Sequence, residues 1–288
     1  MSKHNAEKRL FPLLITAVNT IFWHPVIFFP FLLTAFIQFF ILEILYFSPR
    51  EPLNVFFGPI ISKIWSPEYL HYPLNLILLP KLFQYLQYPV FILLSSYLVS
   101  VSIVIIKNIN EDKSIHLKPL FKQTFSMYVH IVVSALLSFC LYICLMYFFD
   151  MVIARAMEIR SQSGKFFILK RLILEGAPYF YLFFSVLITT LFAYVFPMIA
   201  IERKKVFHAI WENLKLLKGS FFFTFFVVLI PSLFIIPILI LRTTVSIDGA
   251  FPEISVWILV LSICVLLFID AVVYTALTLF YLMLREKQ

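Results

Sequence analysis

The last apolar stretch of the chain, residues 256–284, reads VWILVLSICVLLFIDAVVYTALTLFYLML. Its only formally charged residue is Asp270. About 20 consecutive apolar residues are enough to cross the hydrocarbon core of a bilayer, and this stretch exceeds that length. It is therefore predicted to be a transmembrane helix, which makes lipid rather than water the solvent of the fold.

The rest of the sequence has the same apolar character. Hydrophobic residues make up 62% of the 288 residues and charged residues only 13%, whereas soluble domains carry roughly 25% charged residues. Hydropathy predicts spans near residues 25–47, 81–106, 127–149, 177–200, 220–241 and 255–284. No polar segment is long enough for a separate soluble core. Residues 1–288 are therefore predicted to form a single polytopic domain, an all-α integral membrane protein with about six transmembrane helices.

The basic residues indicate how the chain is oriented. The formal net charge is +8, but Lys and Arg lie in short clusters beside the apolar blocks, as topology signals and headgroup contacts do. We therefore expect no nucleic acid partner. With six spans, 14 Lys and Arg residues share a side with the termini and nine lie opposite. The positive-inside rule then predicts cytoplasmic termini, in a plasma membrane or a bacterial inner membrane.

Three basic segments are predicted to be amphipathic interfacial helices, called elbows here. They are residues 8–23, 117–126 and 203–218, and each runs into a predicted span. In the third elbow an apolar stripe recurs at helical spacing, formed by Val206, Ile210, Leu214 and Leu217. Its predicted headgroup-contacting residues are Lys204, Lys205, His208, Lys215 and Lys218. The order is compatible with three repeats of an elbow and two spans, although basic cytoplasmic loops alone would also produce it.

The segment between the third and fourth predicted spans is also basic, although six spans place it opposite the termini. Within residues 151–175, Phe166, Phe167 and Leu172 alternate with Lys165, Lys170 and Arg171. This pattern predicts an amphipathic helix that lies on the headgroups. The side of the membrane that it occupies is left open.

One part of the sequence resembles a known family. It comprises Tyr194–Glu202 (YVFPMIAIE), then Ala209-Ile210, then Leu214–Gly219 (LKLLKG). These residues resemble the membrane-domain family that is fused to some glycerophosphoryl diester phosphodiesterases, and related stand-alone multi-span proteins. That family ends a span with a Pro and an acidic residue and then places an amphipathic helix ending near Lys-Gly. The opening Leu13–Pro30, with Trp23-His24-Pro25, looks like the start of the family.

The resemblance implies a membrane module concerned with lipids or envelope partners. The phosphodiesterase itself needs a soluble barrel that bears catalytic His and metal-binding carboxylates, and no segment of this chain could supply one. Enzymatic activity is therefore not implied by the resemblance.

A search for catalytic motifs also gives no indication of an enzyme. The sequence contains no GxxxxGK[ST], HExxH, GxSxG or CxxC. Cys140, Cys144 and Cys264 lie inside predicted spans, where thiols usually act as small packing residues. His24 and His130 have no partner at ligand spacing. We therefore predict no catalytic residues, no cofactor and no metal site.

The strongest candidate for a functional side chain is Asp270, which lies near the centre of the last span. A charged acid there costs at least about 2.5 kcal/mol and is a functional hypothesis by default. Tyr274 and Thr278 follow at intervals of four, so the three polar groups share one helix face and form a candidate intramembrane polar site. The carboxyl could lock helix packing through a hydrogen bond, or it could couple or gate transport. Glu202, at the start of the third elbow, is expected to cap that helix.

The sequence thus favours a non-enzymatic integral membrane module, an accessory or scaffold subunit in a lipid-related or envelope process. Its expected partners are membrane lipids, with other membrane protein subunits as further candidates. The alternative is a transporter or conductor of lipid or another amphiphilic substrate. All five glycines lie outside the predicted spans, so the chain lacks the glycines that many transporters use to break helices around a substrate.

Overall fold

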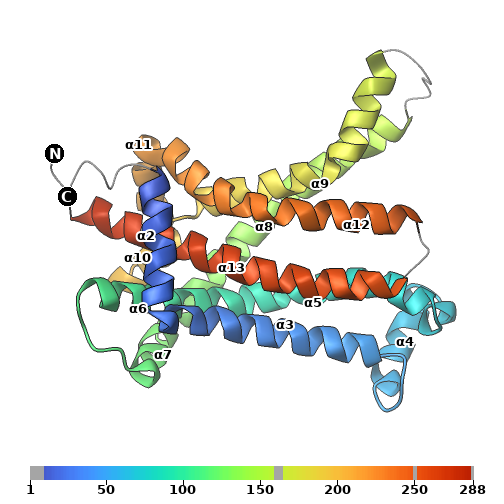
Figure 1. Cartoon of the computed structure of the whole chain (residues 1–288), viewed down its shortest axis with the longest axis horizontal. Helices are drawn as coiled ribbons and strands as arrows, with labels where there is room; N and C mark the ends of the chain where they lie inside the picture. Colours follow the sequence, from blue (N-terminus) through green and yellow to red (C-terminus); the bar gives the residue numbers. More distant parts are fainter. Residues whose placement is uncertain (1–9, 159–164, 249–251, 287–288) are drawn as a thin grey trace.

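The computed structural model describes residues 10–158, 165–248 and 252–286 (Figure 1). Within these ranges the chain forms helices and no strand. Six helical spans are long and apolar enough to cross a membrane, which confirms the predicted fold class. They are Pro25–Phe47, Leu74–Asn110, Tyr128–Glu158, Lys170–Glu202, Val206–Thr244 and Pro252–Arg285.

Several spans contain more than one helical element, mostly because proline interrupts the backbone hydrogen bonding. The first span joins the 3-10 turn η1 (Pro25–Phe28) to α3 (Phe29–Phe47). The second joins α5 (Leu74–Val90), the π turn η3 (Phe91–Ser95) and α6 (Ser96–Asn110), and the π turn closely follows Pro89. Proline lacks an N–H and clashes with the preceding turn, so such irregular turns are expected beside it.

The remaining spans follow in chain order. The third is the single helix α8 (Tyr128–Glu158). The fourth comprises α9 (Lys165–Leu191) and α10 (Val195–Glu202), and the fifth comprises α11 (Val206–Ser232), η4 (Leu233–Ile235) and α12 (Ile236–Asp248). The sixth is α13 (Pro252–Arg285). Figure 1 shows α3, α12 and α13 running along the long axis of the molecule, whereas α8 and α9 run obliquely to it.

Two of the predicted elbows are separate short helices. These are α2 (Leu10–Trp23) and α7 (Leu117–Phe125). In Figure 1, α2 crosses the direction of α3 and α13 at the end of the bundle where α13 ends, and α7 lies at the same end. We call this the terminal end. The 3-10 turn η2 (Pro67–Leu70) and α4 (Asn54–Ile64), which the hydropathy pattern did not predict, precede the second span, and α4 lies at the opposite end.

The third elbow differs from the prediction because it is not a separate helix. Residues 206–218 are the first turns of α11, which continues through Gly219 into the fifth span. No proline interrupts this helix before Pro231, and a lone glycine only weakens a helix. Gly219 therefore does not end the helix, and Gly176 likewise lies inside α9. The hydropathy pattern placed all five glycines outside the spans, which was wrong for these two, because Gly176 and Gly219 lie inside the fourth and fifth spans.

The basic segment 151–175 also differs from the prediction. Its described residues extend α8 to Glu158 and begin α9 at Lys165, so the two long helices account for them without a separate surface helix. Nothing in residues 151–158 breaks a helix, which explains the extension. The side chains of Lys165, Phe166, Phe167 and Leu169 lie outside the described residues.

The protein core surrounds α6. Val101, Ile103, Ile105 and Ile106 are fully buried, and α6 packs against α3, α8, α10 and α13. Serines on the same helix, such as Ser100 and Ser102, are also fully buried and allow neighbouring helices to approach closely. The Ser102 hydroxyl donates to the carbonyl of Ile27 in η1 at 3.3 Å. The core thus ties the first span to the terminal end of the bundle.

Candidate functional site

Asp270 lies in a crevice between three helices. It is near the middle of α13, and α9, α11 and the turn η4 form the other walls. The crevice has a volume of about 110 Å³. We call it the Asp270 crevice; its lining residues are apolar except for Ser185, Thr189, Ser232, Asp270 and Tyr274.

The Asp270 carboxyl has no polar partner within the described part of the chain. The side chain is exposed at the surface of the chain and lines the crevice. No described residue donates a hydrogen bond to it or forms an ion pair with it. No described residue therefore donates the hydrogen bond that a packing role for Asp270 would require. The carboxyl is available to bind a group from outside the described residues.

The other two residues of the predicted polar site are placed differently. Tyr274 lines the Asp270 crevice, and its ring stacks against Phe31 with the centroids 6.4 Å apart. Thr278 is fully buried and donates to the carbonyl of Tyr274 at 2.7 Å, which satisfies its hydroxyl within α13. Hydroxyls of Ser185 and Thr189, on α9, line the crevice instead. Sequence spacing could not reveal them because they come from another span.

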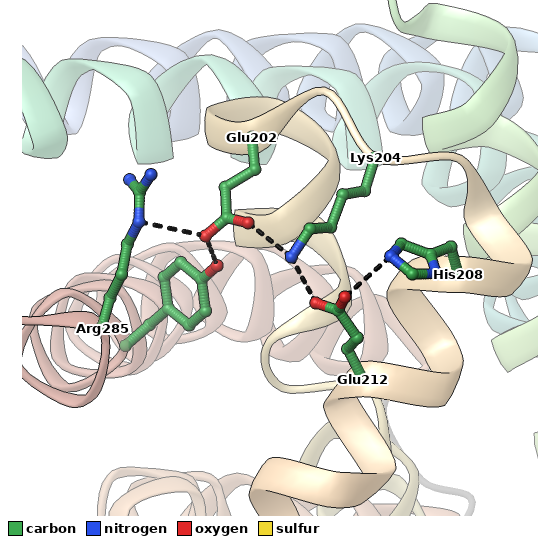
Figure 2. A network of polar contacts seen from close by, with 6 residues as sticks. Glu202, Lys204, His208, Glu212 and Arg285 are labelled. Atoms are coloured by element: carbon green, nitrogen blue, oxygen red, sulfur yellow. Dashed lines mark hydrogen bonds and ion pairs between the residues drawn. The ribbon is translucent and has the colours of Figure 1, made fainter. Parts of the chain in front are cut away.

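A second polar cluster lies where α10, α11 and α13 meet (Figure 2). We call it the Glu202 network; its members are Glu202, Lys204, His208, Glu212, Tyr281 and Arg285. The Lys204 ammonium contacts Glu202 Oε2 at 2.6 Å and also contacts Glu212. His208 Nε2 lies 2.7 Å from Glu212 Oε1. One lysine thus bridges two carboxylates from different helices.

Glu202 is held from the C-terminal helix as well. Arg285 Nε lies 3.3 Å from Glu202 Oε1, and the Tyr281 hydroxyl donates to the same oxygen. The expectation that Glu202 caps the third elbow was wrong, because Glu202 is the last residue of α10 and the residue before α11 is Lys205. Arg203 between them adopts a left-handed conformation with φ of 56°, which turns the chain and brings Lys204 back towards Glu202.

The network changes the electrostatics of Lys204. Partial burial lowers the pKa of Lys204, but hydrogen bonds to Glu202 and Glu212 outweigh this effect and raise the pKa above its usual range. Lys204 therefore stays charged throughout the physiological pH range. Its charge is offset by two carboxylates, so it is a weaker headgroup contact than the sequence suggested.

The predicted headgroup-contacting residues thus fall into two groups. Lys204 and His208 point into the Glu202 network, as Figure 2 shows. Lys205, Lys215 and Lys218 are exposed. The Lys215 ammonium lies over the Trp211 ring, 5.5 Å from its centroid.

The predicted apolar stripe of the third elbow faces the protein more than the lipid. Val206 and Leu217 are buried in the core. Leu214 of the predicted stripe is instead exposed, and it lies with Phe207 and Trp211 at spacings of four and three on the outer face of α11. The sequence contains this second stripe as well, but only the first was predicted.

A buried asparagine, which no sequence pattern singled out, closes the interruption in the fourth span. The chain leaves helical geometry at residues 192–194, ahead of Pro197 in α10. Asn213 is fully buried; its amide nitrogen donates to the carbonyl of Leu191 at 2.6 Å, and its side-chain oxygen accepts from the N–H of Tyr194 at 3.1 Å. The chain therefore contains a broken span without using glycine. The sequence signal for this contact was an asparagine, Asn213, that closely follows a predicted span containing Pro197.

The described residues form no evident metal site and no disulfide. They contain no group of three His, Cys, Asp or Glu side chains placed to hold a metal ion. Cys140, Cys144 and Cys264 are free thiols that lie at the surface of the chain.

Comparison with known proteins found no family model, no curated protein and no solved structure that matches this chain. The resemblance of residues 194–219 to the phosphodiesterase-associated membrane family therefore stays a prediction. The function proposed below is supported by the Asp270 crevice.

Proposed function

We propose that the protein is a non-enzymatic integral membrane module, an accessory subunit or scaffold in a lipid-related or envelope process, and that it binds a partner transmembrane helix at the Asp270 crevice. The observation that supports this proposal is the unpaired carboxyl of Asp270 in the middle of α13. An uncompensated acid at this depth costs at least about 2.5 kcal/mol. A partner helix that inserts a hydrogen-bond donor or a basic side chain would remove that cost.

The size of the crevice favours one side chain over a bulky substrate. A volume of about 110 Å³ holds one side chain or a few water molecules, whereas ligand pockets measure roughly 300–1,000 Å³. A lipid or another large amphiphile would not fit. The Ser185 and Thr189 hydroxyls beside Asp270 would give a donor on the partner helix additional acceptors.

The alternative function is a conductor in which Asp270 binds a proton or small cation. The same hydroxyl groups favour it, because hydroxyl and carboxyl oxygens lining a crevice that admits water suit such a relay. The interrupted fourth span supports it in a general way, since transporters often have broken helices. A substrate as large as a lipid would have to use a different route.

Two substitutions at Asp270 distinguish these functions. Asp270→Asn keeps the size and hydrogen bonding of the side chain, and Asp270→Leu removes both. Binding of a partner helix predicts a complex that is retained with Asn and lost with Leu on native gels after mild solubilisation, while each variant folds normally. Leu261→Ala, at an exposed position on the same helix, is the matched control and should leave the complex intact.

A relay predicts a different pattern. Both Asp270 variants would then form the native-size complex but lose flux in reconstituted vesicles, because neither side chain ionises. A complex of unchanged size in Asp270→Leu would therefore refute the binding of a partner at this crevice.

A further inference from the structure

The Glu202 network forms one wall of a cavity that is separate from the Asp270 crevice. This cavity, which we call the Arg285 cavity, has a volume of about 540 Å³. That volume lies within the usual range for ligand sites. Its lining residues are Met198, Glu202, Lys204, Glu212, Lys215, Leu216, Tyr281 and Arg285.

Some of the positively charged groups that line the cavity are not fully paired with its carboxylates. Glu202 and Glu212 share Lys204, and Arg285 contacts Glu202 only through Nε. Figure 2 shows the two terminal nitrogens of Arg285 turned away from Glu202, and no described residue accepts a hydrogen bond from them. Lys215 contacts the Trp211 ring and no described carboxylate. Two donors thus remain available for an anion.

A neighbouring acid does not cancel this charge. Glu111, at the end of α6, lies close enough to Arg285 to have its pKa lowered by it, although Lys113 has the larger effect. Glu111 already has two lysines of its own, with Lys113 Nζ at 2.6 Å and Lys107 Nζ at 3.8 Å. The three cations that line the cavity therefore exceed its two carboxylates by one, which suits a ligand with a single negative charge.

The surroundings place the cavity at headgroup level. Phe207, Trp211 and Leu214 form an exposed apolar face on the first turns of α11, beside Lys215. Tryptophan and lysine are typical of the membrane interface, and α11 continues from there into the fifth span. A ligand with its anion between Lys215 and Arg285 could therefore extend its apolar part along Trp211 into the bilayer.

We propose that the Arg285 cavity binds the phosphodiester group of a phospholipid, with the phosphate between Arg285 and Lys215. Arginine can hold phosphate oxygens with two parallel hydrogen bonds, and a phosphodiester carries the single negative charge that the lining lacks. This inference is independent of the proposed partner site, because the two sites lie on different parts of α13.

The proposal is tested with delipidated full-length protein and a short-chain phosphatidylglycerol, dihexanoyl phosphatidylglycerol, titrated by calorimetry below its micelle concentration. Wild type should show saturable binding with one site. Lys215→Gln should weaken it about tenfold, the effect of losing one charge-assisted hydrogen bond. Lys218→Gln is the matched control: Lys218 is also a predicted headgroup contact and is exposed on the same helix, but it does not line the cavity. A diffuse surface contact contributes little to binding of a single lipid molecule, so this variant should bind within about twofold of wild type.

Three further measurements distinguish a lipid site from diffuse surface attraction and from a phosphate site. Arg285→Gln should lose at least as much affinity as Lys215→Gln, and its thermal unfolding curve shows whether the fold survives the loss of its contact with Glu202. Equal weakening by Lys218→Gln would overturn the proposal in favour of diffuse surface attraction. Inorganic phosphate that binds as tightly as the lipid would overturn the assignment to a lipid, and an absence of saturation would overturn the site itself.

Discussion

Individual side chains near the terminal end hold three helices together by polar contacts that span long distances in the sequence. Lys204 joins carboxylates on α10 and α11, and Tyr281 and Arg285 bring α13 to the same Glu202. Tyr281 is almost fully buried and Glu202 is mostly buried. Breaking one member of such a network leaves its partners unpaired, which costs more than the contact itself is worth.

Replacing Lys204 with Met should destabilise the protein more at pH 8 than at pH 5. The raised pKa of Lys204 means that its stabilising contribution is complete below its unfolded pKa of about 10.4 and is lost only as the pH rises through the still higher folded value. Wild type therefore keeps it at both pH values. In the variant, Glu202 and Glu212 lose their shared cation, and the repulsion between the two carboxylates is stronger at pH 8 than at pH 5, which lies closer to the ordinary range of carboxyl groups.

Thermal unfolding in detergent at the two pH values measures this difference. Lys205→Met is the control, because Lys205 is exposed and adjacent in sequence. An equal loss at pH 5 and pH 8 would show that Lys204 contributes packing rather than charge.

Replacing Asn213 with Leu should destabilise the protein at the interruption in the fourth span. The substitution leaves the Leu191 carbonyl and the Tyr194 N–H without their side-chain partner, at a cost of about 1–3 kcal/mol for each buried group. Chemical denaturation in mixed micelles should show a loss of that order. Asn110→Leu removes an exposed amide at the end of α6 and should change stability by less than about 0.5 kcal/mol; similar losses for both variants would contradict the role of Asn213.

Among the helices, two predicted elbows end before the next span begins, whereas the third continues into its span. Residues 206–218 continue into the fifth span within the single helix α11, whereas α2 is separated from α3 by the turn at His24 and Pro25. The difference follows from proline, which cannot donate in the helical ladder and is well tolerated at the start of a helix. Glycine at position 219 has no comparable effect.

Substituting Gly219 with Ala tests the continuity of α11. A Cβ at this position would meet nothing within 4 Å, so the change should stabilise the helix by about 0.5–1 kcal/mol. Gly58→Ala is the comparison, since the added Cβ would lie 2.3 Å from Asn54 Oδ1 and that side chain would have to move. A rise in the melting temperature is expected for Gly219→Ala. A fall would indicate that Gly219 is a hinge between an elbow and a separate span.

In the whole molecule, the six spans place α2 and the C-terminal end of α13 at the same end of the bundle (Figure 1). The third elbow begins at that end too, together with the Glu202 network. The C-terminal ends of α3 and α8 lie at the opposite end (Figure 1). This arrangement concentrates basic side chains at the terminal end, as the positive-inside rule requires of a cytoplasmic face.

Both termini are therefore expected on the cytoplasmic side. Fusions of a cytoplasm-active and an export-active reporter at each terminus should give the cytoplasmic signal in both positions, and a fusion inserted at residue 161 should give the exported one. The three fusions act as controls for one another. Termini on opposite sides would exclude the six-span arrangement and with it the order of elbow and two spans in each third of the chain.

Hydropathy along the chain was enough to predict the number and approximate place of the spans, because an apolar run as long as the bilayer is thick forms a crossing helix. It also located Asp270, since a single acid inside residues 256–284 is visible without any fold. In contrast, the packing of the helices sets which face of α11 is buried, which carboxylates contact Lys204, and why Asn213 is buried. Those outcomes depend on residues that are distant in the chain and become neighbours only when helices pack. Local periodicity carries no information about which helix will be the neighbour.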